Sequence, residues 1–573
     1  MPACPDRPFA SLVGVLALVA TLTAGPRAAS ADSLAIVPPA TPGPYAVGCS
    51  DLTQDFSRLA PGEAASDYWE GRPDGNRPRY VINLLSDLDH AYYMSVAIPN
   101  DATLYGRYAG TGIDVVTLVC YPTTADNPRP GYALPNGVTI PHMQQQGGAP
   151  LWPDASQFPV LLFSHGLGGS PISGDYIDAM KIFASHGYVV VAPFHADARV
   201  ADTNLDNLAN IGYAILHFQD YVAMQALRPL ELRAVLDAVL ASPDFHDHVD
   251  ANRVGAFGAS LGGESVMLMG GAALTTTVGM SSKPVLYDPR VKAAVGYVPY
   301  FGLSIYPAFG RDQRGLDGVT LPYLAIAGTA DTTAPIAATR TGIARLTSTR
   351  QLVALQGVQH GFNAAFSDDI FTWSLDFLDG QLSGDAAARA KSARMTRVAG
   401  GGDDRLEQDY AAPTPPAADE RIAVEYYNAS LDHYFFTAEP AEAAMLDAGV
   451  IVPGWTRTGY DFKVRPVGDP RGLVACRFFG TPGVGPNSHF FTIDADECAK
   501  VRNDPFWMFE GFAFNADPPA NADCPADRVP VVRLYNNGKG GQANHRFLTS
   551  HSAIGDTLGQ GWIVEGPVFC AIP

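Results

Sequence analysis

The chain has 573 residues, which is too long for one ordinary hydrophobic core, so we expect two or more domains. Hydrophobic residues make up 47% of the chain and charged residues 17%, a composition typical of globular proteins. The net charge of −20, without a basic stripe, argues against a protein that binds nucleic acid.

Residues 1–31 are predicted to form a signal peptide. Arg7 supplies a positive charge, residues 12–22 form an apolar run, and residues 29–31 (Ala-Ser-Ala) are a small-residue cleavage site. A membrane anchor is the alternative, but the apolar run is short for a span. We therefore expect a secreted protein, extracellular or periplasmic, that begins near Asp32 and does not span a membrane.

The cysteines are predicted to form disulfides. Removal of the signal peptide takes away Cys4 and leaves an even number, which in an oxidising compartment indicates disulfide bonds. Several pairings are open, and we expect the one that keeps each pair within one domain: Cys49–Cys120, Cys476–Cys498 and Cys524–Cys570. No cluster has metal-ligand spacing, so neither a metal nor another cofactor is expected.

Residues 32–385 alternate strand-like and helix-like segments. The expected strands are mostly short apolar runs without periodicity, as in strands covered on both faces. They are residues 113–120, 158–163, 188–192, 254–257, 291–298, 323–327 and 352–355, and residues 230–240 and 370–378 read as helices. This alternation predicts an α/β domain with a doubly wound, mostly parallel sheet and helices on both faces.

One pentapeptide of this domain, Gly258-Ala259-Ser260-Leu261-Gly262, has the pattern of a nucleophile elbow. It follows an expected strand and precedes a helix-like run, the setting in which a serine is held on a sharp turn. The pattern alone arises easily by chance in a chain this rich in glycine. Its meaning therefore depends on an acid and a histidine at the ends of later strands.

Both partners follow in the required order. Asp331 comes after the strand 323–327, and His360 comes after the strand 352–355. In a doubly wound sheet, functional groups gather at the carboxyl ends of strands. His360 would take the proton of Ser260, and Asp331 would orient the imidazole and balance its charge. Taken singly, His360 reads equally well as a loop residue and Asp331 as a turn residue.

Two backbone N–H groups are candidates for an oxyanion hole. One belongs to Leu261, the residue after the nucleophile. The other belongs to Leu167, in the glycine-rich loop 164–169 that follows the strand 158–163. We interpret His165 of this loop as a brace rather than a base, because His360 is better placed for that role.

Residues 77–385 resemble the α/β-hydrolase family, closest to the branch of secreted lipases, platelet-activating-factor acetylhydrolases and dienelactone-hydrolase-like esterases. The phrases FPVLLFSHGLGGS, ASHGYVVVAPFHAD, VGAFGASLGGES, AGTADTTAP and GVQHGFN carry the resemblance. It implies hydrolysis of carboxylic esters through an acyl-serine, without a metal. Dienelactone hydrolases proper use a cysteine nucleophile, so their lactone specificity does not carry over to Ser260.

The sequence indicates the type of reaction more clearly than the substrate. Small-molecule, lipid and polymer esters all remain open. Residues 196–228 form either a lid over an acyl pocket or a packed helix, and residues 297–301 line either that pocket or the core. A serine peptidase on the same fold and a binding or adhesion protein that uses the fold as a scaffold are the alternatives. An intact set of Ser260, Asp331 and His360 argues against a scaffold.

Residues 386–420 are predicted to be a linker, because they contain three consecutive glycines at 400–402 and a proline-rich stretch at 413–416.

Residues 421–573 are predicted to form a smaller, β-rich domain of three repeats. His433, His489 and His545 stand 56 residues apart (489 minus 433 and 545 minus 489), each in a similar aromatic phrase. The region resembles a bacterial repeat module of unknown function that is often found on secreted proteins. We expect the repeated aromatic residues to form its core. Three binding sites for a surface or polymer, or a metal bound by the three histidines, are the alternatives.

Overall fold

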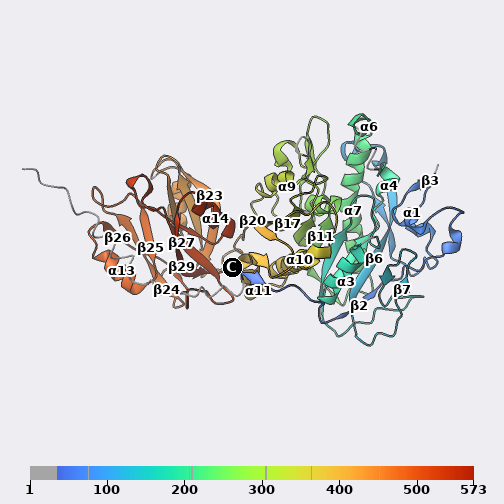
Figure 1. The fold of residues 1–573 in the computed structure, drawn as a ribbon, viewed down its shortest axis with the longest axis horizontal. Helices are drawn as coiled ribbons and strands as arrows, with labels where there is room; N and C mark the ends of the chain where they lie inside the picture. Colours follow the sequence, from blue (N-terminus) through green and yellow to red (C-terminus); the bar gives the residue numbers. More distant parts are fainter. Residues whose placement is uncertain are drawn as a thin grey trace, which may run out of the picture.

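The computed structural model describes residues 35–573 apart from 75–76, 174, 205–206, 208–210, 304–305, 363 and 451. The predicted signal peptide lies outside the described residues. Figure 1 shows two lobes side by side, an α/β lobe and a β-rich lobe, with the C-terminus at their junction. No helix in the described ranges is both long and apolar enough to cross a bilayer.

A ten-stranded sheet forms the centre of the α/β lobe. Five successive pairings, from β10 to β18, are parallel, whereas β2, β5, β6 and β20 pair antiparallel at the two sides. The mostly parallel sheet predicted from the sequence is confirmed. In spatial order the strands are β2 (Ala46–Cys49), β6 (Gly112–Thr123), β10 (Val189–Pro193), β9 (Phe158–Ser164), β11 (Val249–Ala259), β14 (Val291–Tyr297), β17 (Tyr323–Gly328), β18 (Arg350–Leu355) and β20 (Asp404–Tyr410), with β5 (Tyr93–Ala97) beside β6.

Each face of this sheet has its own hydrophobic core. In β9, Val160 and Leu162 belong to one core and Leu161 and Phe163 to the other, as expected from the alternation of side chains along a strand. The first core includes α7 (Phe218–Ala241), α8 (Leu261–Met269) and α9 (Ile336–Ile343), and the second includes α3 (Tyr176–Ser185) and α10 (Ser367–Leu382). Burial on both faces explains why the inner strands are apolar throughout.

The linker predicted over 386–420 is wrong for most of that segment. Within residues 386–410 lie α11 (Ala386–Arg394), β19 (Arg397–Val398) and β20, and residues 411–420 form neither helix nor strand. β20 pairs with β18 and so completes the sheet. The glycines at 400–402 form the tight turn between β19 and β20, and a side chain at Gly402 would collide with the Phe366 ring.

The β-rich lobe contains three copies of one unit, in which two strands, a helix and a third strand follow one another. In each copy the three strands form a separate antiparallel sheet. The copies are β21 (Arg421–Asn428), β22 (His433–Thr437), α12 (Pro440–Asp447) and β23 (Trp455–Val464); β24 (Leu473–Gly480), β25 (His489–Thr492), α13 (Ala495–Arg502) and β26 (Trp507–Ala516); and β27 (Val529–Tyr535), β28 (His545–Leu548), α14 (His551–Gly559) and β29 (Ile563–Ala571).

Equivalent aromatic residues from the three copies meet in one shared core. Phe436, Phe491 and Phe547 are buried there, with their rings in mutual contact. Phe462, Phe514 and Phe569 fill the same core from the third strands. The repeated aromatic residues therefore have the core role that we expected for them.

Three disulfide bonds are present, and they have the expected pairing: Cys49–Cys120, Cys476–Cys498 and Cys524–Cys570. The first joins directly opposed residues of β2 and β6. Each of the others ties a strand of the β-rich lobe to a segment of the same lobe. Cross-links of this kind stabilise a fold mainly by restricting the unfolded chain.

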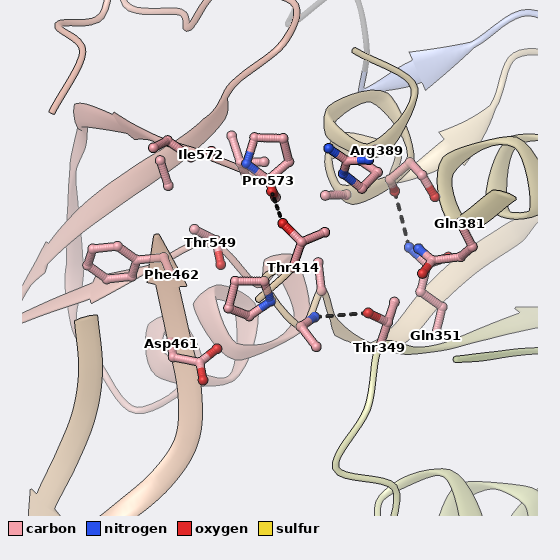
Figure 2. Close-up of a pocket in the computed structure, with 17 residues that line it drawn as sticks. Thr349, Gln351, Gln381, Arg389, Thr414, Asp461, Phe462, Thr549, Ile572 and Pro573 are labelled. Atoms are coloured by element: carbon pink, nitrogen blue, oxygen red, sulfur yellow. Dashed lines mark hydrogen bonds between the residues drawn. The ribbon is translucent and has the colours of Figure 1, made fainter. Parts of the chain in front are cut away.

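The two lobes meet through polar contacts between β20 and α14. The Asp409 carboxylate accepts hydrogen bonds from the Ser550 hydroxyl and from the His551 and Ser552 N–H groups, at 2.7–3.0 Å. A cavity of about 60 Å³ lies at the same junction, with Thr349 on one side and Pro573 on the other (Figure 2). It includes none of the predicted site residues.

Candidate active site

Ser260 occupies a strained turn between β11 and α8. Its backbone has φ 53° and ψ −118°, in the left-handed half of the map that residues with side chains rarely adopt. A hydrogen bond of 2.9 Å from the Ser260 N–H to the Tyr297 carbonyl holds the turn against the neighbouring strand. Such strain persists where the surroundings fix it, and it is concentrated at functional sites.

The glycines of the pentapeptide are required by close backbone packing. A Cβ at Gly258 would collide with the carbonyl of Gly262, and a Cβ at Gly262 would collide with the carbonyl of Ser164. Gly262 therefore lets the start of α8 rest directly on the end of β9. This packing brings the loop after β9 beside the serine.

The three predicted residues Ser260, Asp331 and His360 form one chain of hydrogen bonds. The Ser260 hydroxyl lies 2.9 Å from His360 Nε2, and His360 Nδ1 lies 2.8 Å from Asp331 Oδ2. Their elements, β11, β17 and β18, are parallel, so the residues that follow them meet at one edge of the sheet. The Asp331 side chain is fully buried, whereas that of His360 is 26% exposed.

Neighbouring groups fix both the acid and the histidine. Asp331 Oδ1 accepts hydrogen bonds of 2.8 Å from the Thr333 and Ala334 N–H groups, which leaves Oδ2 for His360. The Tyr297 hydroxyl donates to the Gly361 carbonyl at 2.7 Å and so braces the histidine loop. Tyr297 is fully buried, which favours a core role for this residue over a pocket-lining one.

The loop after β9 passes beside the serine. A Cβ at Gly166 would lie 3.4 Å from Ser260 Cβ, and the Gly166 N–H donates to the Tyr176 hydroxyl at 3.0 Å. His165 Nε2 accepts from the His195 N–H at 3.1 Å, so Nδ1 carries the proton and donates to the Gly166 carbonyl. Burial holds the pKa of His165 well below its ordinary value. His165 is therefore a neutral brace without contact to Ser260, as the sequence led us to expect.

Two backbone N–H groups near the serine remain unpaired. Within the described part of the chain, neither the Leu167 nor the Leu261 N–H has a hydrogen-bond acceptor. Leu261 is the first residue of α8, where N–H groups lack helical partners and the helix dipole favours negative charge. Both are available to bind a developing oxyanion.

A buried carboxyl group that the sequence did not single out lies behind the elbow. Glu264, one turn after Ser260 on α8, is fully buried and accepts hydrogen bonds of 2.9 and 3.0 Å from the Gln225 amide. Burial raises its pKa to about 8, so the group is protonated at neutral pH. The signal that could have found this buried carboxyl group is a single glutamate within an otherwise apolar helix.

The segment 196–228, predicted as either a lid or a packed helix, is described in part. It includes α4 (Asp197–Val200), α6 (Ile211–Leu216) and the start of α7, while residues 205–206 and 208–210 lie outside the described residues. Leu216, at the end of α6, is 83% exposed. The choice between a lid and a packed helix therefore stays open.

Metal binding finds no support among the described side chains. No group of three or more His, Cys, Asp and Glu residues has an arrangement that would hold an ion. The repeat histidines His433, His489 and His545 are among the described residues and belong to no such group.

Two family comparisons match parts of the chain. The family described as platelet-activating factor acetylhydrolase, isoform II, matches residues 135–210, which contain β9 and the loop after it but end before Ser260. A domain of unknown function (DUF5648) matches residues 422–572, the three repeats. A search of curated protein sequences finds no match. The chain is thus similar to a family of ester-cleaving hydrolases over part of its α/β lobe and to a family of unknown function over its β-rich lobe.

Proposed function

We propose that the protein is a secreted serine hydrolase that cleaves carboxylic esters through an acyl-serine intermediate, on a doubly wound α/β-hydrolase fold. The observation that carries this proposal is the hydrogen-bond chain from Asp331 through His360 to Ser260, on an elbow held at a strained φ. The partial match to a family of ester hydrolases supports the same reaction class.

The first half of the reaction forms the acyl-enzyme. Ser260 Oγ attacks the ester carbonyl while His360 Nε2 accepts the hydroxyl proton. Asp331 keeps the imidazole in the tautomer with Nδ1 protonated and balances the imidazolium charge. The N–H groups of Leu167 and Leu261 bind the oxyanion, and His360 then gives its proton to the leaving alcohol.

The second half repeats these steps with water. His360 Nε2 takes a proton from a water molecule, whose oxygen attacks the acyl carbonyl, and the same two N–H groups bind the new oxyanion. Collapse of this intermediate breaks the bond to Ser260 Oγ. His360 returns the proton to the serine, and the carboxylic acid is released.

The substrate that we propose is a small-molecule, lipid or polymer ester. A surface- or polymer-binding role for the β-rich lobe is supported by exposed apolar side chains around β26. Phe506, Met508 and Phe512 are 53%, 44% and 51% exposed, although large apolar residues usually lie inside a domain. A pull-down of the full chain on insoluble polyester, with and without Phe512→Ser, tests this role.

The proposal is tested by hydrolysis of p-nitrophenyl esters of graded acyl length. Ser260→Ala should lower kcat by about 10⁴-fold or more, because no nucleophile remains. Ser374→Ala is the control, because Ser374 is a buried serine of α10 whose hydroxyl donates to the Ile370 carbonyl and takes no part in the chain from Asp331 to Ser260. A fluorophosphonate probe should label the wild type and the control but not Ser260→Ala. Equal ester rates for wild type and Ser260→Ala, or cleavage of peptides alone, would contradict the proposal.

A further inference from the structure

A cluster of six polar residues is buried directly beneath the loop 164–169 and takes no part in the chemistry described above. Each member is at most 3% exposed, and the members come from the end of β9 and the loop after it, the turn after β10, the start of α4, and α7. We call it the buried cluster: Ser164, His165, His195, Asp197, Arg228 and Glu231. Charged groups so far from water are costly to bury unless they are paired, so each contact in the cluster is informative.

Arg228 joins a carboxylate to the backbone of the loop. Its Nε donates to Asp197 Oδ1 at 2.8 Å, and its Nη2 also contacts Asp197 Oδ2. On its other side, Nη1 donates to the His165 carbonyl at 2.6 Å and Nη2 to the Gly166 carbonyl at 3.3 Å. The guanidinium thus binds two consecutive carbonyls, which a planar fork of donors does well and a lysine ammonium does poorly.

These contacts fix the direction of the next N–H group. The Gly166 carbonyl accepts from both Arg228 and His165. In a planar trans peptide the carbonyl and the following N–H point in opposite directions. The Leu167 N–H is therefore turned away from the cluster and stays free for a ligand, while the Gly166 N–H is occupied by Tyr176.

A second part of the cluster supports the same loop at its start. His195 Nδ1 lies 2.5 Å from Glu231 Oε2, and His195 Nε2 lies 2.8 Å from the Ser164 hydroxyl. Burial raises the pKa of Glu231 to about 8 and holds that of His195 well below its ordinary value, so a protonated carboxyl group faces a neutral imidazole at neutral pH. Ser164, His195 and Glu231 are hydrogen-bonded in the same serine–histidine–acid order as a catalytic triad. They are fully buried, however, and cannot contact a substrate.

We propose that Arg228, held by Asp197, is a positioning residue that presents the Leu167 N–H to the oxyanion of the reaction. The inference rests on the proposed function, because it assigns a task within ester hydrolysis. It predicts that loss of the guanidinium weakens binding of the transition state and leaves binding of the ground-state ester nearly unchanged.

The test compares kcat, KM and inhibition by butylboronic acid for wild type, Arg228→Lys, Arg228→Met and Asp197→Asn. Boronic acids form an anionic tetrahedral adduct with a serine and so report on the oxyanion hole. Removal of one oxyanion donor lowers kcat by about 10²- to 10³-fold. We expect a loss of that size in Arg228→Met, a smaller one in Arg228→Lys, KM within about threefold, and weaker boronate binding in the same order.

Arg546→Met is the matched control. Arg546 is likewise buried and paired with a carboxylate, that of Glu425, but it lies in the β-rich lobe. Its loss should lower the thermal midpoint without changing kcat or boronate affinity. Should Arg228→Met fail to fold, Arg228→Lys and Asp197→Asn still carry the comparison, because both retain the size of the side chain.

The outcomes separate this inference from the proposed function. Wild-type kcat and boronate affinity in the folded Arg228 and Asp197 variants would overturn the positioning role, and so would a loss confined to KM. Absence of ester hydrolysis by the wild type, or equal rates for wild type and Ser260→Ala, would overturn the proposed function and this inference with it.

Discussion

At the scale of residues, the absence of one side-chain carbon, a Cβ at Gly262, determines how α8 packs beside Ser260. Gly262 has no side chain, and α8 can therefore approach β9 closely enough for backbone to meet backbone. The same closeness places Ser260, the proposed nucleophile, next to the loop that contains Leu167. The geometry of the proposed reaction thus depends on a residue that has no side chain to take part in it.

Gly262→Ala should accordingly destabilise the protein and abolish activity. The new methyl group collides with the Ser164 carbonyl, and overpacking of this kind costs about 3 kcal/mol. Urea unfolding and ester hydrolysis measure the two effects. Gly555→Ala is the control, because Gly555 lies within α14 with open space at its Cβ, and the change should stabilise by about 0.5–1 kcal/mol. Equal stability of the two variants would contradict the packing argument.

Glu264 should make stability depend on pH. Its pKa is about 8 in the folded protein against an ordinary value of 4.5, so between these values the folded state holds a proton that the unfolded chain releases. Stability therefore falls as pH rises through this window, by about 1.4 kcal/mol for each unit of pH in the steepest part.

Glu264→Gln should remove this dependence, because the amide keeps the contact with Gln225 but does not titrate. We expect similar thermal midpoints for the two proteins near pH 4.5 and a growing advantage for the variant up to pH 8. The raised pKa of Glu231 acts equally on both proteins and cancels in the difference. Parallel curves across the whole range would show that Glu264 is ionised in the folded state.

The sequence predicted some residues of the candidate site and missed others, for a physical reason. Ser260, Asp331 and His360 each follow a recognisable strand, so their order and their place at strand ends can be read from short stretches of sequence. Arg228 ends the segment 196–228 and Glu231 lies in the predicted helix 230–240, and neither of them follows a recognisable strand. Only tertiary packing buries these two side chains, and the partners of Arg228 come from the loop after β9 and from the start of α4, which no local pattern connects.

At the scale of elements, β20 is an edge strand that the sequence pattern did not predict. The inner strands are apolar on both faces and stand out, whereas β20 reads Asp-Arg-Leu-Glu-Gln-Asp-Tyr, with one side toward solvent. The glycines before it suggested flexibility, but they make a turn. Its role depends on β18, which needs hydrogen-bond partners along its outer edge.

Truncation tests the importance of β20. A chain of residues 32–385 should be less soluble and melt at a lower temperature than a chain of residues 32–412. The shorter chain leaves the backbone of β18 unpaired and removes Asp404, which accepts a hydrogen bond from the buried Trp373 indole. Soluble yield and thermal midpoint measure the difference. Equal behaviour of the two chains would mean that the sheet is complete at β18.

At the scale of the whole molecule, the α/β lobe supplies part of a helix cap to the β-rich lobe. The helices α12 and α13 are capped by acidic residues of their own repeats, Glu439 and Asp494. The third helix, α14, has Ser550 at that position, and Asp409 of β20 provides the carboxylate. The contact therefore joins the two lobes at a defined helix end.

Asp409→Ala should loosen the junction without unfolding either lobe. Removal of a capping carboxylate costs about 1 kcal/mol, because the N–H groups at the start of α14 lose their acceptor. We expect faster cleavage within residues 411–420 in limited proteolysis and a lower midpoint for the β-rich lobe. Asp494→Ala, which removes a cap inside that lobe, should lower the same midpoint but leave cleavage at the junction unchanged. Identical cleavage rates for the two variants would contradict a docking role for Asp409.

The pairing of β1 (Ile36–Val37) with β19 has a consequence for the order in which the chain folds. The Thr396 hydroxyl donates to the Ala35 carbonyl across 361 positions of sequence, so one of the first described strands has its partner near the end of the same lobe. A ribosome must synthesise almost the entire lobe before this contact can form. Contacts of such long range slow folding, because the connecting chain must first be ordered. The lobe therefore reaches its final structure only near the end of its own synthesis or later, and until then β1 lacks its partner strand.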